Sequence, residues 1–235
     1  MTSDKSLQTY ILLGSKVWSK SVFESELELL PGSWYFISSL EEFNIKKIKE
    51  INPRYIFFLH WSWKVPASII HEYECVCFHM TDVPYGRGGS PLQNLILREH
   101  QITKLTALRM TYEFDAGPVY CKEELGLGGN AEAIYLRATR LSIKMIQRIV
   151  TEKPVPVPQT GEVTVFRRRI PAESQVTEAQ SLERFYDHIR MLDAEGYPKA
   201  FIEYQGFRLE FSRAALYNGR IVADVVITPI EETNP

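Results

Sequence analysis

The chain has 235 residues and a formal net charge of −2, with 45% hydrophobic and 24% charged residues. This length suits one large domain or one medium and one small domain, and the composition is typical of a soluble globular protein. The charge balance excludes a strongly basic nucleic-acid footprint, no apolar run approaches the roughly 20 residues that span a bilayer, and the polar N-terminus lacks the features of a signal peptide. We therefore expect a cytoplasmic protein with no membrane partner and no nucleic-acid partner.

Strand-like and helix-like segments alternate through the first half of the chain. Apolar runs predict strands at Tyr10–Leu13, Trp34–Ile37, Tyr55–Leu59 and Cys75–Phe78. Helices are expected between them, one of them with Ser39 as its N-cap. The almost wholly apolar run Tyr55–Leu59 is typical of a strand buried on both faces. The pattern predicts an α/β fold, with a Rossmann-like, mostly parallel sheet and helices on both of its faces.

The second half of the chain contains the remaining predicted elements, and within it a proline-rich segment precedes a segment rich in short strands. A helix over Leu92–Glu99 and strands over Leu105–Thr111 and Val119–Lys122 are followed by a long helix that Asn130 caps. Three prolines in Lys153–Gly161 then predict a stiff, extended connector. A helix at Ser181–Asp193 and three short strands follow, two of them joined by the hairpin turn Asn218–Gly219. We expect a catalytic domain over residues 1–152, a connector and strand over 153–180, and a small β-rich C-terminal domain over 181–235.

Two stretches carry residue types suited to chemistry. His79 directly follows an apolar strand, at the sheet edge where such folds bind ligands. The loop Tyr85–Pro91 then has three glycines, which let backbone groups approach a flat ligand closely. Downstream, Asp115 sits in a Gly-Pro turn between two apolar segments.

These two stretches resemble the signature of the folate-dependent formyltransferase superfamily. That pattern is Asn-x-His at a strand end, a polar and proline-containing loop, Arg-Gly-Gly and proline, then Asp-x-Gly-Pro. This sequence has His79–Pro91 and Asp115-Ala116-Gly117-Pro118 in the same order. The resemblance covers Tyr10 to Val150, and the C-terminal segment Phe185–Phe201 is similar to segments of sugar-nucleotide formyltransferases. It implies an enzyme that uses 10-formyltetrahydrofolate as formyl donor.

The resemblance assigns His79 and Asp115 as the catalytic pair. His79 would donate a hydrogen bond to the developing oxyanion, and Asp115 would orient His79 and accept the proton of the attacking amine. The family's asparagine two residues before the histidine is Cys77 here, and a thiol is a weak hydrogen-bond donor. Asn94 is a candidate to supply the missing contact. No metal is required.

The resemblance also places the folate against the loop after His79 and the turn that holds Asp115. Trp61 and Trp63 leave the neighbouring strand end, so pocket lining and core packing are equal alternatives for them. Arg167–Arg169 would contact a phosphate or form a solvated cluster. The expected folate-binding residues are Trp61, Ser62, Trp63, Met80, Thr81, Asp82, Val83, Pro84, Tyr85, Gly86, Arg87 and Phe114.

The acceptor amine is expected to belong to a nucleotide-linked amino sugar used in surface-polysaccharide synthesis. The chain length, the small C-terminal domain and the absence of a basic surface favour it over initiator methionyl-tRNA. An aminoacyl group on a carrier protein is the other enzymatic alternative, and a catalytically dead folate-binding module is the non-enzymatic one. We expect a homodimer through the C-terminal domain. The odd number of cysteines, Cys75, Cys77 and Cys121, predicts reduced thiols.

Overall fold

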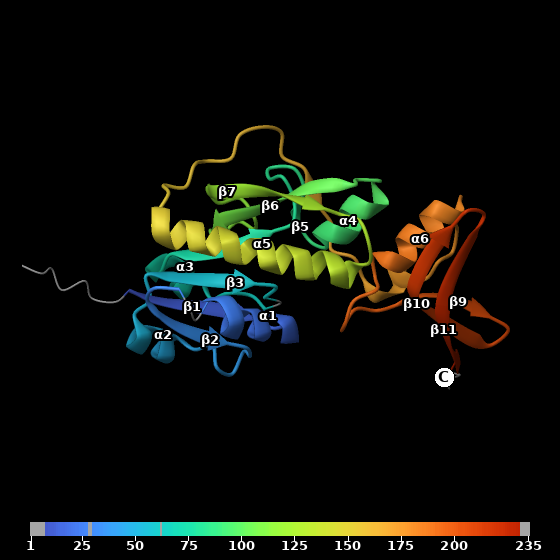
Figure 1. Cartoon of the computed structure of the whole chain (residues 1–235), viewed down its shortest axis with the longest axis horizontal. Coiled ribbons are helices and arrows are strands. Elements are labelled where there is room, and N and C mark those ends of the chain that lie inside the picture. Colours follow the sequence, from blue (N-terminus) through green and yellow to red (C-terminus); the bar gives the residue numbers. More distant parts are fainter. Residues whose placement is uncertain (1–7, 28–29, 62, 231–235) are drawn as a thin grey trace, which may run out of the picture. The chain divides into compact units, whose positions relative to one another are not determined.

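A computed structural model describes residues 8–27, 30–61 and 63–230, and the chain divides into two compact units. The first unit comprises the described parts of Met1–Arg87, Lys104–Leu125 and Leu136–Val165. The second comprises the described parts of Gly88–Thr103, Gly126–Tyr135 and Phe166–Pro235. Figure 1 labels the helices and strands of both units. No helix in these described ranges is both long and apolar enough to cross a membrane.

The first unit is built on a six-stranded sheet with the strand order β2-β1-β3-β4-β6-β7. β1 pairs in parallel with β2 and β3, β3 pairs in parallel with β4, and β4 pairs antiparallel with β6. This arrangement confirms the expected mostly parallel α/β sheet. The strands are β1 (Thr9–Gly14), β2 (Ser33–Ile37), β3 (Tyr55–Leu59), β4 (Cys75–His79), β6 (Ile102–Arg109) and β7 (Val119–Gly126).

Both faces of this sheet are covered. All five residues of β3 are buried, and their side chains alternate between the two faces. On one face, Ile56 and Phe58 belong to a core cluster with Ile48 and Ile69 from the covering helices. This burial explains the unbroken apolar run in the sequence. The helices of the unit are α1 (Val17–Val22) with the π turn Phe23–Leu27, α2 (Ile45–Ile51), α3 (Ala67–Glu72) and most of α5 (Ala131–Glu152).

α2 begins five residues later than the sequence suggests. Its N-cap is Asn44, whose side-chain oxygen accepts a hydrogen bond from the Lys47 backbone N–H at 2.9 Å. The expected cap, Ser39, instead belongs to a local turn in which its hydroxyl accepts from the Glu42 N–H at 3.4 Å. The prediction of a helix from Ser39 was therefore wrong, because side-chain bonds to the nearby backbone compete with helix formation there.

The second unit has an antiparallel sheet in the order β11-β10-β9. The expected hairpin turn is confirmed, with Gly219 at a φ of 73° between β10 and β11. Within this unit the buried Asp193 carboxylate accepts hydrogen bonds from Asn130, Lys199 and the Arg213 backbone N–H. The elements are α4 (Pro91–Leu97), the first turn of α5, the 3-10 turn Pro171–Ser174, α6 (Leu182–Arg190), β9 (Ala200–Tyr204), β10 (Phe207–Tyr217) and β11 (Arg220–Pro229).

A two-stranded ribbon follows the glycine-rich loop. β5 (Arg87–Gly88) pairs with β8 (Val165–Phe166), and this places the end of that loop beside the chain that follows the proline-rich segment Lys153–Gly161. Gly89 continues this close approach, since a Cβ there would lie 2.5 Å from the Arg168 Cα. Only glycine fits at that position.

Candidate active site

The two residues expected to be catalytic lie together in the first unit. His79 is the last residue of β4, and Asp115 lies in the turn between β6 and β7. The His79 Nδ1 and the Asp115 Oδ1 are 3.5 Å apart, with side chains 9% and 17% exposed. Asp115 has a φ of 54°, which non-glycine residues adopt uncommonly. The structure therefore brings a nearly buried imidazole against a slightly more open carboxylate.

The second ring nitrogen of His79 faces a backbone carbonyl. Its Nε2 lies 2.8 Å from the Gly86 oxygen, which also accepts from the Thr81 hydroxyl at 3.2 Å. A carbonyl oxygen only accepts, so Nε2 carries the hydrogen. The ring is thus fixed at both nitrogens, with Nδ1 directed at Asp115. Gly86 reaches this position with a φ of 75°.

Cys77 lies beside this pair. It shares a face of β4 with His79, because the two residues are two positions apart in a strand. Burial raises the pKa of the Cys77 thiol well above its usual range, and the Asp115 carboxylate raises it further. The thiol therefore stays neutral, which makes it neither a nucleophile nor a strong hydrogen-bond donor.

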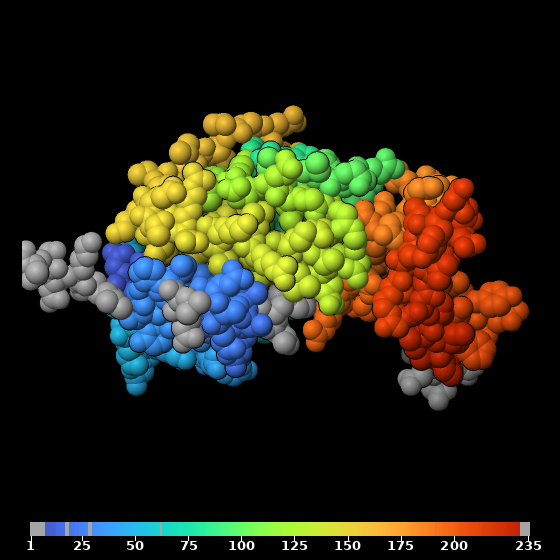
Figure 2. Space-filling view, viewed as in Figure 1, coloured from blue at the N-terminus to red at the C-terminus, as the bar shows by residue number. Residues whose placement is uncertain are grey.

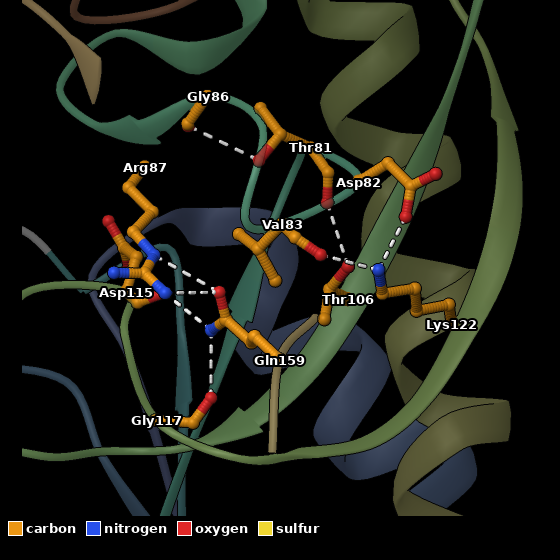
Figure 3. A network of polar contacts seen from close by, with 10 residues as sticks. All are labelled: Thr81, Asp82, Val83, Gly86, Arg87, Thr106, Asp115, Gly117, Lys122 and Gln159. Carbon is orange, nitrogen blue, oxygen red and sulfur yellow. Dashed lines mark hydrogen bonds and ion pairs between the residues drawn. The ribbon is translucent and has the colours of Figure 1, made fainter. Parts of the chain in front are cut away.

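The loop after His79 is anchored from neighbouring strands, as Figure 3 shows. The Thr106 hydroxyl donates to the Thr81 carbonyl at 2.7 Å, and the Lys122 ammonium donates to Asp82 at 2.5 Å and to the Val83 carbonyl at 2.6 Å. Sequence reasoning missed Lys122 and Thr106, since their only signal is a position on strands next to the loop. The side chains of Met80, Thr81, Val83 and Pro84 are buried. A ligand would therefore meet backbone groups together with Asp82 and Tyr85.

The far end of this loop is held by the proline-rich segment. The Arg87 guanidinium donates to Gln159 through Nε at 3.0 Å and Nη2 at 2.8 Å, and contacts Glu113 at 3.3 Å. The Gln159 amide in turn donates to the carbonyls of Asp115 and Gly117, both at 2.8 Å. Sequence reasoning missed Gln159 as well, because it lies in a segment that was predicted to be a connector.

One aromatic side chain next to the pair is open to a flat ligand. Phe114 precedes Asp115 and is 73% exposed, which leaves its ring open to stacking. Trp63 is 40% exposed, whereas Trp61 packs edge-on against Phe43. The expected binding residue Ser62 lies outside the described residues. An open aromatic face, backbone groups and a carboxylate together suit the ring system of a folate.

Asn94 lies in the second unit and is committed to structural bonds. Its amide nitrogen donates to the carbonyls of Gly89, Ser90 and Arg167 at 3.0–3.1 Å. Its oxygen accepts from Arg98 at 2.9 Å. These contacts use the hydrogen-bonding capacity of the amide and favour a structural role over the expected contact with an oxyanion.

His60, which follows β3, and the run Arg167–Arg169 both have local partners. His60 Nε2 lies 2.9 Å from the Thr139 hydroxyl on α5, which favours a structural role for this histidine. In the arginine run, Arg167 pairs with Glu173 and Arg169 donates to the Glu173 carbonyl. Within the described ranges, no group of three or more His, Cys, Asp or Glu side chains is arranged to hold a metal ion.

Comparison with known proteins extends these observations. Residues 171–228 match the family model for the C-terminal domain of methionyl-tRNA formyltransferase. A methionyl-tRNA formyltransferase from Clostridium thermocellum shares 44% identity and a TM-score of 0.90, over 95% of this chain and 100% of that chain. A curated methionyl-tRNA formyltransferase from Ehrlichia ruminantium is 25% identical over 209 residues, which cover 86% of this chain and 67% of that protein.

More distant structures share the fold alone. A sugar N-formyltransferase from a Shewanella species matches at 12% identity with a TM-score of 0.61, over 96% of this chain and 99% of that chain. HypX from Aquifex aeolicus, solved with tetrahydrofolic acid, matches at 15% identity with a TM-score of 0.72, over 87% of this chain and 37% of that chain. The expectation of a nucleotide-linked amino sugar as acceptor, and of a role in surface-polysaccharide synthesis, is therefore wrong. The 44% identical relative is a methionyl-tRNA enzyme.

Proposed function

This chain belongs to the formyltransferase family, and we propose that it transfers the formyl group of 10-formyltetrahydrofolate to the α-amino group of methionyl-tRNA. Formyltransferases of this family use 10-formyltetrahydrofolate as the formyl donor. The acceptor rests on one observation, the 44% identity to a methionyl-tRNA formyltransferase over the full length of that chain. With tRNA as the acceptor, this proposal replaces the earlier expectation that the protein has no nucleic-acid partner.

The donor supplies a formyl carbon bound to nitrogen N10, and side chains of the protein accept and donate the protons that move during the reaction. A bond forms from the amine nitrogen to the formyl carbon, and the bond from that carbon to N10 breaks. Asp115, the more exposed member of the pair, takes the proton that the attacking amine loses. Asp115 passes this proton to His79 Nδ1, the ring nitrogen that the Gly86 carbonyl does not hold, and Nδ1 donates it to N10, so that the protons balance over one turnover.

The ring of His79 is prepared for this role by its two contacts. Nδ1 faces Asp115 at 3.5 Å and Nε2 faces the Gly86 carbonyl at 2.8 Å. Catalytic hydrogen bonds are often long without substrate and tighten when it binds. The Asp115 carboxylate accepts a hydrogen bond from Nδ1 when that nitrogen carries a hydrogen, and this contact holds the ring in place during the transfer.

The proposal is tested by turnover with defined acceptors. The protein is incubated with 10-formyltetrahydrofolate and charged methionyl-tRNA, and formylmethionine is measured after the ester is hydrolysed. Uncharged tRNA and free methionine serve as controls. Formylmethionine formed only with charged tRNA supports the proposal, and its absence while folate still binds would refute it in favour of a folate-binding module.

Variants of the pair test the assignment of roles. His79→Ala and Asp115→Ala are each expected to abolish transfer but to leave folate affinity within about tenfold, because both act on the reacting atoms rather than on the folate ring. Full activity of either variant would contradict the assignment. Folate binding is measured by equilibrium dialysis on the same preparations.

A further inference from the structure

Gln159 joins the loop and the turn that make up the site. Its oxygen accepts from Arg87, at the end of the loop, and its nitrogen donates to the carbonyls of Asp115 and Gly117 (Figure 3). A glutamine amide has two N–H hydrogens and two oxygen lone pairs. All four are used here. The guanidinium only donates and the carbonyls only accept, so the amide has a single satisfactory orientation.

The segment that carries Gln159 is stiff. Pro154, Pro156 and Pro158 each fix φ and have no backbone N–H. Val157 makes both of its backbone hydrogen bonds to Val119, at 2.7 and 2.9 Å. This backbone anchor lies two residues before Gln159 and holds the segment at Val119, the first residue of β7, directly after the turn that contains Asp115.

The turn that Gln159 holds has little freedom on its other side. A Cβ on Gly117 would lie 1.7 Å from the Arg109 carbonyl oxygen, so the turn presses against the end of β6. Asp115 keeps a left-handed φ of 54° two residues earlier. Arg109 on one side and Gln159 on the other therefore fix the backbone from which the Asp115 carboxylate projects.

We propose that Gln159 is a positioning residue, which sets the Asp115 carboxylate against His79 and couples it to the loop through Arg87. This inference rests on the proposed function of the same site. Displacement of a reacting group by about 1 Å costs on the order of 100-fold in rate. Loss of the two donor contacts to the turn is therefore expected to reduce kcat strongly.

Two substitutions separate the two ends of the amide. Gln159→Glu keeps an acceptor for Arg87 but removes both donors to the turn, while Gln159→Met removes both ends at similar length. Gln159→Glu is expected to lower kcat roughly 30- to 100-fold and to change the donor KM by less than about threefold. Gln159→Met is expected to lower kcat similarly and also to raise the donor KM, because Arg87 loses its partner. Gln147→Glu and Gln147→Met, on the exposed surface of α5, are the matched controls and are expected to behave as wild type.

Hydrogen exchange provides a readout that does not depend on the acceptor. Amides in residues 110–118 are expected to exchange faster in Gln159→Glu than in wild type, while those of α5 are unchanged. Unchanged exchange in that segment would overturn the inference, and so would a kcat within about threefold of an active wild type. A wild type that does not formylate methionyl-tRNA would instead refute the proposed function, and the exchange measurement would still decide the role of Gln159.

Discussion

Cys77→Asn would restore the side chain that the family pattern has two residues before its histidine. The thiol is neutral and a weak donor, since burial and the Asp115 charge raise its pKa. An amide at the same place on β4 could donate a real hydrogen bond to the oxygen on which charge develops. One preorganised donor of this kind contributes about 10²- to 10³-fold to kcat. An asparagine introduced at this position has not been optimised for the geometry of the site, so we expect a smaller gain than this, an increase in kcat of at least about tenfold.

The same substitution has a cost in stability that can be measured separately. Cys77 packs against the core cluster, so the amide must find partners or lose roughly 1–3 kcal/mol of unfolding free energy. The assay compares kcat and thermal unfolding for Cys77→Ala, Cys77→Ser and Cys77→Asn, which form a series of increasing donor strength. We expect kcat of Cys77→Ala to equal that of wild type, kcat of Cys77→Ser to be higher, and kcat of Cys77→Asn to be the highest of the series. A folded Cys77→Asn with wild-type kcat would refute the reasoning and mean that another group holds the oxyanion.

Four further predictions follow from the contacts described above. Lys122→Met should weaken donor binding about tenfold by equilibrium dialysis, because a hydrogen bond to a charged group contributes roughly 1.5 kcal/mol, and unchanged affinity would count against the anchored loop. Burial and Arg169 lower the pKa of His188. As pH falls, the unfolded chain therefore takes up this proton before the folded protein does. The free energy of unfolding should fall as pH drops from about 7 through the unfolded pKa near 6.5. His188→Gln keeps a donor for the Ser174 carbonyl, and thermal unfolding of this variant should lack that part of the pH dependence. Burial raises the pKa of Cys75 to about 12 and that of Cys121 to about 11, so iodoacetamide should label neither in the native protein at neutral pH, and rapid labelling seen by mass spectrometry would contradict this. The KM for methionyl-tRNA should rise with salt concentration, because side chains that contact phosphates displace counterions from the tRNA, and a KM that does not change with salt would contradict contacts to its backbone.

The fold was predictable where burial and turn chemistry act locally. The run Tyr55–Leu59 coincides with β3, because a strand covered on both faces must be apolar throughout. Asn130 caps α5 through its bond to the Ala133 N–H at 3.0 Å, and Asn218–Gly219 forms the expected hairpin turn. The start of α2 was missed because Ser39 and Asn44 are both good caps, and only the competing turn decides between them.

The site was predictable only in part, and the missing part is long-range. His79 and Asp115 come from two motifs, and the structure brings them within 3.5 Å. Gln159 has no motif, and its role depends on where a proline-rich segment crosses a turn 44 residues earlier in the sequence. The proline-rich composition of this segment predicts a stiff connector between domains, but it equally suits a stiff segment that supports the turn around Asp115. Stiffness alone does not tell the two apart, since the difference lies in what the segment contacts.

The acceptor was misjudged for a physical reason. The motifs around His79 and Asp115 perform formyl transfer, which needs the same proton movements for any amine, so they carry no information about what bears that amine. The choice between an amino sugar and methionyl-tRNA was therefore based partly on the net charge of −2. Net charge describes the whole surface and governs only non-specific attraction to nucleic acid. Recognition of an aminoacyl ester at the end of a tRNA can instead depend on a few local contacts. The segment 171–228, which matches the C-terminal domain of methionyl-tRNA formyltransferase, is therefore where substitutions should change the KM for the acceptor and leave the donor KM unaltered.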